Sequence, residues 1–402
     1  MRRALSHVGG EVEVVARPGW DAGPLVAALT VTDDRARVLR HVHGFHSYPA
    51  RMHPDTAAGL VRALGRPGQT VLDPFMGSGT VLVEARLSGH RAWGVDANPL
   101  AVELATLKAG GLDARERQAL LAAARAVVER AEARRQARAG ATRRYGLRDR
   151  ELFEPHVLLE LDGLRAALEA ARAPAPVRRA LWLVLSSLLT KVSRQLGDTA
   201  TETVPRRLAS GFTIRLFRDR ATLLAEQLAA LAALLPPRPP PLRVEEGDAR
   251  RLDGIPDGSV GLVVSSPPYP GVYDYHAQHA TRLRWLGLDA AAFERRELGA
   301  RRRLAALAPA AAAAAWEREL DAALGALARV LAPDGRAALL IADSAIGPVP
   351  LRADELVARL AGRRCLAIAL RASQRRPHFH APTRAAFGGR ARREHLIVLE
   401  RG

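Results

Sequence analysis

The chain has 402 residues, 48% of them hydrophobic, which is enough for a large core and argues against disorder as the main state. No apolar run reaches about 18 residues, so no transmembrane helix is expected, and a single cysteine, Cys365, excludes an internal disulfide or a cysteine-based zinc site. Sixty basic against 42 acidic residues give a net charge of +18, which favours a polyanionic partner, although a solvated arginine-rich surface is an equal alternative.

The pattern of elements along the chain predicts four segments. Residues 1–44 carry no motif and form an N-terminal extension. Residues 45–105 read as helix, strand, glycine-rich turn, helix, strand and helix, which is typical of a cofactor-binding half. Residues 106–241 are helical, rich in Ala, Leu and Arg, and end in a proline-rich stretch, which predicts a helical insertion. From residue 242 to 402 the α/β pattern resumes.

Seven short apolar runs predict strands, and most of them are continuous rather than alternating. Continuous runs belong to strands that helices cover on both faces, so we expect a doubly wound, mostly parallel sheet. The predicted strands are Thr70–Asp73, Ala92–Asp96, Arg243–Glu246, Gly261–Ser265, Ala338–Asp343, Cys365–Arg371 and His395–Glu400.

The first strong motif is the turn that follows the strand ending at Asp73. It reads Asp73-Pro74-Phe75-Met76-Gly77-Ser78-Gly79-Thr80. Its two glycines let the backbone approach a ligand at the carboxyl end of the strand, against the N-terminus of the next helix. The second strand ends in Asp96, followed by Asn98, and an acid at that position can accept hydrogen bonds from both hydroxyls of a ribose.

This motif differs from the dinucleotide fingerprint, because Leu82 stands where the third glycine would be. Asp73 would also repel a pyrophosphate, whereas it suits a ligand with an α-ammonium group. S-adenosylmethionine has a ribose, a sulfonium and an amino-acid tail, so it satisfies both acids.

The second strong motif is Ser266-Pro267-Pro268-Tyr269, directly after a buried strand. Two prolines end the strand and fix an extended turn at its carboxyl end, where the sites of α/β sheets lie. The Ser266 hydroxyl and the Pro267 carbonyl offer two acceptors for the hydrogens of an exocyclic amine, which would localise the nitrogen lone pair. The Tyr269 ring offers a face for a base turned out of the duplex.

These two motifs resemble the cofactor and catalytic motifs of the N4-cytosine/N6-adenine DNA methyltransferases. The resemblance covers about residues 45–105 and 243–402. It implies a Rossmann-like class I methyltransferase fold with a seven-stranded, mostly parallel sheet and a helical insertion. It further implies methyl transfer from S-adenosylmethionine to the exocyclic amine of a DNA base. Serine at the first position of the catalytic motif is more usual in the N4-cytosine enzymes, so cytosine is favoured over adenine.

The resemblance also assigns residues to the site. Tyr48 lies in a segment, 48–54, that resembles the family's motif beside the methionine tail, and Asp248 follows the third strand, where the adenine of the cofactor is contacted. The implied catalytic residues are Ser266, Pro267, Pro268 and Tyr269. The implied cofactor-binding residues are Asp73, Pro74, Phe75, Gly77, Gly79, Thr80, Asp96, Asn98, Asp248 and Tyr48.

Two regions are candidates for contact with nucleic acid. Residues 371–393 contain seven arginines and no acid, so Arg375, Arg376 and Arg384 are predicted phosphate contacts, with a solvated loop as the alternative. Arg194 ends a predicted helix of the insertion, and one group of the family places target recognition between its two motifs. A polar helix end without a ligand is the alternative for Arg194.

Two other functions remain open at this stage. The same fold supports RNA base methyltransferases, and the chain could be a nucleic-acid-binding protein without catalysis, although both motifs are intact. The expected setting is cytoplasmic, without a membrane, and DNA methylation in a restriction-modification system would add a restriction endonuclease as a partner. No metal site is predicted, because no carboxylate completes a recognisable ligand motif at the histidine clusters. The sequence leaves the oligomeric state open.

Overall fold

The computed structural model describes residues 11–32, 34–195, 197, 202–271, 273–378 and 381–402. Residues 1–10 of the predicted N-terminal extension lie outside the described residues. Within the described part of the chain, no helix is both long enough and apolar enough to cross a membrane.

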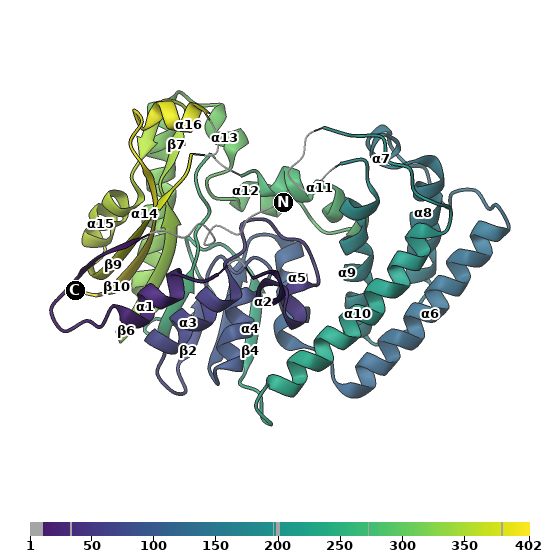
Figure 1. Ribbon diagram of the computed structural model, residues 1–402, viewed down its shortest axis with the longest axis horizontal. Coiled ribbons are helices and arrows are strands. Elements are labelled where there is room, and N and C mark those ends of the chain that lie inside the picture. Colours follow the sequence, from purple (N-terminus) through teal and green to yellow (C-terminus); the bar gives the residue numbers. More distant parts are fainter. Residues whose placement is uncertain (1–10, 33, 196, 198–201, 272, 379–380) are drawn as a thin grey trace.

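A single large sheet forms the centre of the fold, with its strands in the order β1-β9-β10-β6-β5-β2-β3-β4 (Figure 1). Strands β4, β3, β2, β5 and β6 are parallel, and β10 runs antiparallel to both β6 and β9. The strands are β1 (Val12–Ala16), β2 (Thr70–Asp73), β3 (Arg91–Asp96), β4 (Leu242–Glu246), β5 (Val260–Ser265), β6 (Leu331–Ala342), β9 (Leu366–Arg376) and β10 (Arg392–Arg401). A separate hairpin pairs β7 (Ser344–Ile346) with β8 (Val349–Leu351).

The predicted doubly wound, Rossmann-like sheet is confirmed, and all seven predicted strands are present. The main sheet has eight strands rather than seven, because β1 pairs with the edge strand β9. The chain changes direction between the two motifs in the usual way for such sheets, from β2 outward to β4 and then back to β5 beside β2.

Neighbouring residues of each central strand point to opposite faces of the sheet, and both faces are covered. Val71 and Leu262 belong to a core with α3 (Pro54–Leu64), α4 (Thr80–Leu87) and α5 (Pro99–Gly110). Leu72 and Val263 belong to a second core with α14 (Pro309–Val330) and α15 (Ala353–Arg363). This double covering explains why the strands read as continuous apolar runs.

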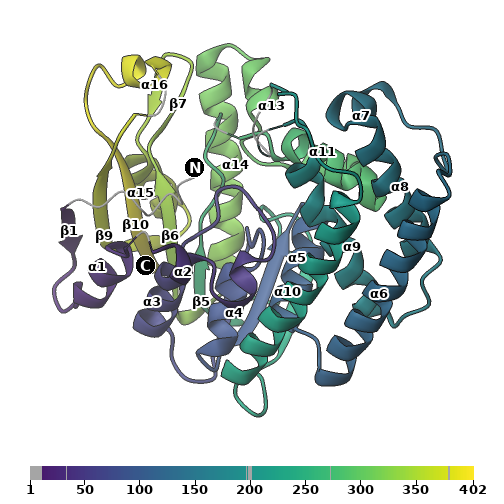
Figure 2. The ribbon, with the colours of Figure 1, turned by 45° about the vertical axis from the view of Figure 1, so that its right-hand side comes forward.

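A group of five helices, four of them long, lies between the two halves of the sheet in sequence and beside α5 in space (Figures 1 and 2). Asp113 begins the first of them with a capping box, in which its side chain and that of Glu116 bond each other's backbone amides. The helices are α6 (Ala114–Gln136), α7 (Leu147–Leu152), α8 (Pro155–Glu169), α9 (Ala175–Val192) and α10 (Phe212–Leu234).

The remaining helices lie before the first motif and around the carboxyl edge of the sheet. They are α1 (Gly23–Leu29), α2 (Arg35–Val38), the 3-10 helix η2 (His41–Gly44), α11 (Tyr275–Leu286), α12 (Ala291–Arg296), α13 (Arg301–Ala305) and α16 (Ala381–Ala386).

Candidate active site

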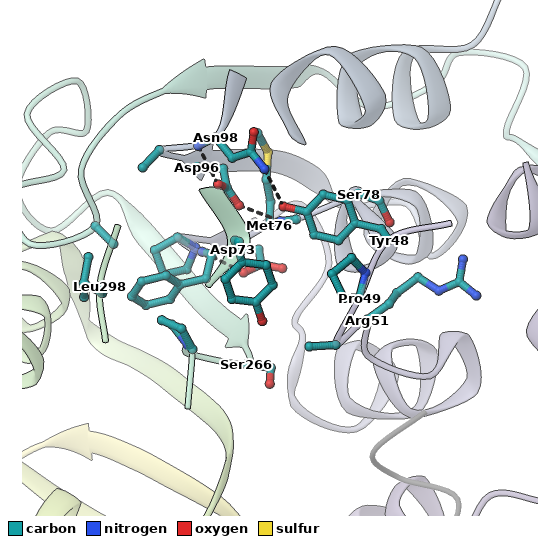
Figure 3. A pocket seen from close by; sticks show the side chains of 18 of the residues that line it. Tyr48, Pro49, Arg51, Asp73, Met76, Ser78, Asp96, Asn98, Ser266 and Leu298 are labelled. Carbon is teal, nitrogen blue, oxygen red and sulfur yellow. Dashed lines mark hydrogen bonds between the residues drawn. The ribbon is translucent and has the colours of Figure 1, made fainter. Parts of the chain in front are cut away.

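A pocket opens at the carboxyl ends of β2, β3 and β5 (Figure 3). It contains about 820 Å³ of empty space, including the part open to solvent. The predicted site residues that line it are Tyr48, Asp73, Pro74, Phe75, Gly77, Thr80, Asp96, Asn98, Ser266 and Pro268. The two motifs therefore share one pocket, although 192 positions separate Asp73 from Ser265.

Asp73 connects the first motif to the end of β5, immediately before the second motif. Its Oδ1 accepts a hydrogen bond from the Ser265 hydroxyl at 2.6 Å and another from the Phe75 amide at 3.1 Å. Burial is the main cause that raises the pKa of the Asp73 carboxyl to about 7, and the hydrogen bond from Ser265 opposes the shift. A cationic ligand bound beside this buried carboxyl group would lower its pKa, because the positive charge favours the ionised form.

Asp96 organises the backbone at the end of β3, the strand that pairs with β2. Its Oδ2 accepts from the Gly77 amide at 2.8 Å, and its Oδ1 accepts from the Asn98 amide at 2.9 Å. Burial raises the pKa of Asp96 to about 6, against these backbone hydrogen bonds. The acid thus ties the end of β3 to the glycine turn after β2, in the position expected for a ribose contact.

Tyr48 and Asn98 meet above the glycine turn. The Tyr48 hydroxyl accepts from Asn98 Nδ2 at 3.1 Å, and the same amide lies 2.8 Å from His279 Nδ1. A Cβ added to Gly77 would lie 3.1 Å from the Tyr48 ring, and Gly77 has a positive φ of 49°. The tyrosine therefore closes over a turn that only glycine fits comfortably.

A buried lysine supports the turn from below. Lys108 of α5 is fully buried, and its Nζ donates to the Ser78 hydroxyl at 3.1 Å. Burial lowers the pKa of Lys108 well below its ordinary value, and the nearby Arg51 guanidinium adds to this effect.

Several lining residues were not among the site residues predicted from the sequence. Arg51 contributes a mostly buried guanidinium that donates to the His43 carbonyl. Glu297 accepts from the Tyr275 amide at 2.6 Å, and burial raises its pKa to about 7. Tyr275, Phe293 and Leu298 add apolar or aromatic surface to the same wall.

The charges of the pocket fit S-adenosylmethionine. Among the described residues, Asp73, Asp96 and Glu297 make no ion pair, and burial raises the pKa of each. Arg51 brings the opposite charge to the same wall. A ligand with an ammonium group, a carboxylate and a ribose can interact favourably with both the acidic and the basic side chains. A polyanionic ligand could not, because the three acids would repel it.

The catalytic turn is only partly arranged as the sequence predicted. Ser266 and Pro268 line the pocket, and β5 ends at Ser265 immediately before them. Tyr269 is only 4% exposed and does not line the pocket, so the prediction that its ring faces a base differs from this structure. Its hydroxyl instead lies 3.2 Å from Glu394 Oε1, and its ring packs in the second core.

Two predicted cofactor residues also lie beside the pocket rather than on it. Gly79 is the N-cap of α4, buried against Ala105 of α5. The Asp248 carboxylate is held by Arg250, with Nε 2.9 Å from Oδ1, and it lines a separate, neighbouring cavity. Ala249, the next residue, lines the main pocket.

The predicted phosphate contacts fall into three situations. Arg375 and Arg384 are exposed, on β9 and α16. Arg376 is a correction: its side chain is 2% exposed and paired with Glu394, so it is not accessible to a phosphate. Arg194 is paired with Glu154 at 2.9 Å, so its charge is already balanced in this structure.

Two groups of histidine and carboxylate side chains lie close enough together to bind a cation, but arginines already pair with their carboxylates. Arg40 Nη2 lies 2.8 Å from Glu84 Oε1, and Arg352 Nη1 lies 3.2 Å from Asp343 Oδ2. Both groups therefore act as internal ion-pair networks. They are His41, His43 and Glu84, and Asp343, Asp354 and His395.

The raised pKa of Asp73 predicts a pH dependence of cofactor binding. The pKa is about 7 in the free protein, and a bound ammonium group would lower it, so affinity should rise as the pH increases from 5.5 to 7.5. The gain should end near pH 8, where an α-amino group loses its own proton. Calorimetric titration of S-adenosylmethionine across this range should show the trend. In Asp73→Asn the rise should become smaller, because only Asp96, with a pKa of about 6, and Glu297, with a pKa of about 7, still titrate among these pocket acids. An unchanged profile would contradict the role of Asp73.

Asp96→Ala should weaken binding of S-adenosylmethionine by about 1–3 kcal/mol, because polar groups of the ligand and the Gly77 amide lose their acceptor. The same titration at pH 7.5 measures it. Unchanged affinity in this variant would remove Asp96 from the cofactor site.

Comparisons with known proteins agree with this reading of the pocket. A family model described as DNA methylase, covering N6 and N4 enzymes, matches residues 32–107. The type II methyltransferase M.MjaII of Methanocaldococcus jannaschii is 32% identical over 89 residues, which are 22% of this chain and 16% of the relative. The type II methyltransferase M.MvaI of Kocuria varians is 38% identical over 69 residues, which are 16% of this chain and 15% of the relative.

The matched region spans only about a sixth of each of these relatives. Among solved structures, the rRNA methyltransferase aviRa of Streptomyces viridochromogenes is 14% identical over 92% of this chain and 94% of its own, with a TM-score of 0.36, which is too low to support an argument. The family match includes Tyr48, Gly77 and Asp96, which line the pocket. Over residues 32–107, which include these positions, the chain is therefore similar to the DNA methylases that act on N6 and N4 amino groups.

Proposed function

We propose that the protein transfers a methyl group from S-adenosylmethionine to the exocyclic amine of a DNA base, with N4 of cytosine favoured over N6 of adenine. The observation that carries this proposal is the shared pocket. The hydrogen bond between Asp73 and Ser265 fixes the end of β2 against the end of β5, so that Ser266 and Asp73 line one cavity.

Each side of the pocket has a role in this reaction. Asp73 and Arg51 would hold the amino-acid tail of the cofactor, and Asp96 the ribose. When bound, S-adenosylmethionine supplies an electrophilic methyl group. Ser266 Oγ and the Pro267 carbonyl would accept hydrogen bonds from the target amine, which favours a localised lone pair on nitrogen. The preference for cytosine depends on serine as the first residue of the catalytic motif.

The surroundings of the pocket suit a long polyanion. Because β9 is antiparallel to β10, which is antiparallel to β6, the β9–β10 connection lies at the same edge of the sheet as the pocket. The helix α16 belongs to this connection. In both Figure 1 and Figure 2, α11 lies between α16 and α7. Exposed arginines occur on both sides: Arg375, Arg384 and Arg390, and Arg144, Arg148 and Arg150. The helices from α6 to α10 are the proposed target-recognition segment.

The β9–β10 connection can be tested through salt dependence. Replacing Arg375, Arg384 and Arg390 together by alanine should flatten the slope of log Kobs against log salt by up to about 3 units, since each phosphate contact contributes about 0.9. The matched control replaces three exposed arginines at the opposite edge of the sheet: Arg62 and Arg238, which precede β2 and β4, and Arg91, the first residue of β3. Equal slopes in the two triple variants would exclude the connection from the interface.

Labelled methyl transfer followed by nucleoside analysis tests the function itself. The protein is expressed in a host that lacks DNA methylation, and its genomic DNA is sequenced at base resolution. Purified protein is also offered duplex DNA, tRNA and rRNA. N4-methylcytosine in DNA is the expected product. Label in RNA alone would favour the RNA methyltransferase, and cofactor binding without transfer would favour a non-catalytic protein. A restriction endonuclease partner stays a prediction of the family resemblance.

A further inference from the structure

Three polar side chains from distant parts of the sequence meet just after the end of β3. Asn98 is the N-cap of α5, and its Oδ1 accepts a hydrogen bond from the Leu100 amide at 3.0 Å. That bond fixes which end of the Asn98 side chain carries the oxygen, because a backbone amide can only donate. The Nδ2 group therefore faces the other two residues. It lies 3.1 Å from the Tyr48 hydroxyl and 2.8 Å from His279 Nδ1.

The direction of these hydrogen bonds follows from the hydrogens that Asn98 carries. Its Nδ2 group has two hydrogens and cannot accept, so it donates one to Tyr48 and one to His279. His279 Nδ1 is then the acceptor, with the ring hydrogen on Nε2. The Tyr48 hydroxyl accepts as well, so its bond to Asn98 does not use its own hydrogen. Within the described part of the chain, Asn98 is the hydrogen-bond partner of this hydroxyl, and Tyr48 lines the pocket, so that hydrogen is available to a ligand.

The Tyr48 ring is confined by packing as well as by its hydroxyl. The centre of the ring lies 4.8 Å from the centre of the His279 ring. The glycine turn approaches it so closely that a Cβ added to Gly77 would lie 3.1 Å from Tyr48 Cε1. His279 is itself fully buried, in α11. These contacts limit the directions in which Tyr48 can offer its hydrogen.

Asp96 supplies the complementary group beside Tyr48. The Asn98 backbone amide donates to Asp96 Oδ1 at 2.9 Å while its side chain donates to Tyr48, so one residue holds both (Figure 3). An ionised Asp96 can only accept, whereas Tyr48 has a hydrogen to donate. A hydroxyl group of a ligand can bond both residues, because it donates its hydrogen and accepts through its oxygen. A carboxylate could not bond an ionised Asp96, and an ammonium group could not accept from Tyr48.

We propose that Asn98 and His279 hold Tyr48 as a hydrogen-bond donor to a ribose hydroxyl of the cofactor, beside the acceptor Asp96. The inference rests on the proposed function for the identity of the cofactor. Tyr48 touches the ligand, whereas Asn98 and His279 are positioning residues that act through the Tyr48 hydroxyl. The part of the chain that follows the catalytic motif thereby contributes to cofactor recognition, through His279.

Tyr48→Phe keeps the ring and removes the donor. Calorimetry without nucleic acid compares four ligands: S-adenosylhomocysteine, its 2′-deoxy and 3′-deoxy analogues, and 5′-methylthioadenosine, which keeps the ribose and lacks the amino-acid tail. The substitution should weaken binding of S-adenosylhomocysteine and of 5′-methylthioadenosine by the same factor, roughly three- to ten-fold, as for loss of one hydrogen bond. It should not change the affinity for one of the two deoxy analogues, the one without the hydroxyl that Tyr48 contacts.

The matched control is Tyr145→Phe, which removes a buried hydroxyl that donates to Asp162 within the helical insertion. It should keep the parental Kd for all four ligands. Three results with Tyr48→Phe would overturn the proposal: unchanged affinity for S-adenosylhomocysteine, an equal loss with all four ligands, or a loss confined to the ligands that carry the amino-acid tail.

His279→Leu tests the positioning role, because it removes the acceptor of Asn98 and keeps an apolar side chain in the core. Affinity should fall with the same ligand pattern, and the double variant with Tyr48→Phe should bind no more weakly than Tyr48→Phe alone. His279→Asn, whose side-chain oxygen can replace Nδ1 as the acceptor, should bind more tightly than His279→Leu. Multiplied losses in the double variant would overturn the role of His279.

The ligand comparison with Tyr48→Phe decides the proposal even if His279→Leu does not fold, because Tyr48 is only partly buried. It also separates the proposal from the proposed function. A parental protein that shows the expected binding pattern but methylates no nucleic acid would refute the proposed function and leave the role of Tyr48 intact.

Discussion

Ser266→Ala should lower the kcat of methyl transfer roughly 10²-fold, because it removes a preorganised acceptor for the target amine at the moment when charge develops on nitrogen. The substitution leaves the cofactor side of the pocket intact, so the Kd of S-adenosylmethionine should stay within about two-fold of the parental value. Single-turnover transfer of a labelled methyl group to DNA measures the first quantity, and calorimetry measures the second.

The neighbouring serine provides the control. Ser265 is fully buried and donates to Asp73 rather than facing the pocket. Its hydrogen bond lowers the pKa of Asp73, so Ser265→Ala should raise that pKa further and weaken cofactor binding at neutral pH. Two adjacent serines should therefore show opposite phenotypes, one in turnover and one in cofactor affinity. A parental kcat in Ser266→Ala at saturating cofactor would show that this hydroxyl takes no part in the reaction.

The location of the site could be predicted from sequence because it follows from strand direction. Asp73, Asp96 and Ser265 each end a buried strand, and the carboxyl ends of parallel strands meet at one edge of a sheet. The continuous apolar runs that predicted those strands also predicted that helices cover both faces of the sheet. Neither inference needs the positions of individual side chains.

Which side chain of a motif faces the ligand is harder to derive. The sequence offered Ser265 and Ser266 side by side, and only the end of β5 decides that Ser265 turns toward Asp73. The ring of Tyr269 was expected at the pocket, but it fills the core beside β10 instead, because Glu394 offers a buried acceptor for its hydroxyl. Glu394 lies 125 positions away, so no local pattern announces that contact.

The error at Arg376 has a local cause. The strand was predicted to end at Arg371, whereas β9 continues to Arg376. Within a strand, successive side chains alternate between faces, so Arg375 is exposed and Arg376 is buried. A longer predicted strand would have separated the two arginines. The strand β1 was not predicted, because most of its residues are exposed and it joins only the edge of the sheet.

Gly79→Ala should produce the largest loss of stability among single substitutions at the cofactor turn. Gly79 is the N-cap of α4 with a φ of 80°, and a Cβ there would lie 2.9 Å from the Cα and Cβ of Ala105 in α5. The left-handed conformation costs about 1–2 kcal/mol for an L-residue, and forcing two packed helices apart costs about 1–3 kcal/mol more. We therefore expect a loss of about 2–5 kcal/mol in the free energy of unfolding, measured with urea.

A substitution of Gly89, at the other end of the same helix, separates the conformational cost from the cost of forcing the two helices apart. Its φ is 82°, and nothing lies within 4 Å of an added Cβ, so Gly89→Ala should show the conformational cost alone. Because the Gly79 substitution pushes α4 away from α5, it should also displace the turn that carries Gly77 and Ser78, and affinity for S-adenosylmethionine should fall with stability. Gly89→Ala should keep that affinity. Equal losses of stability in the two variants would show that the close approach of Ala105 is not what requires glycine at position 79.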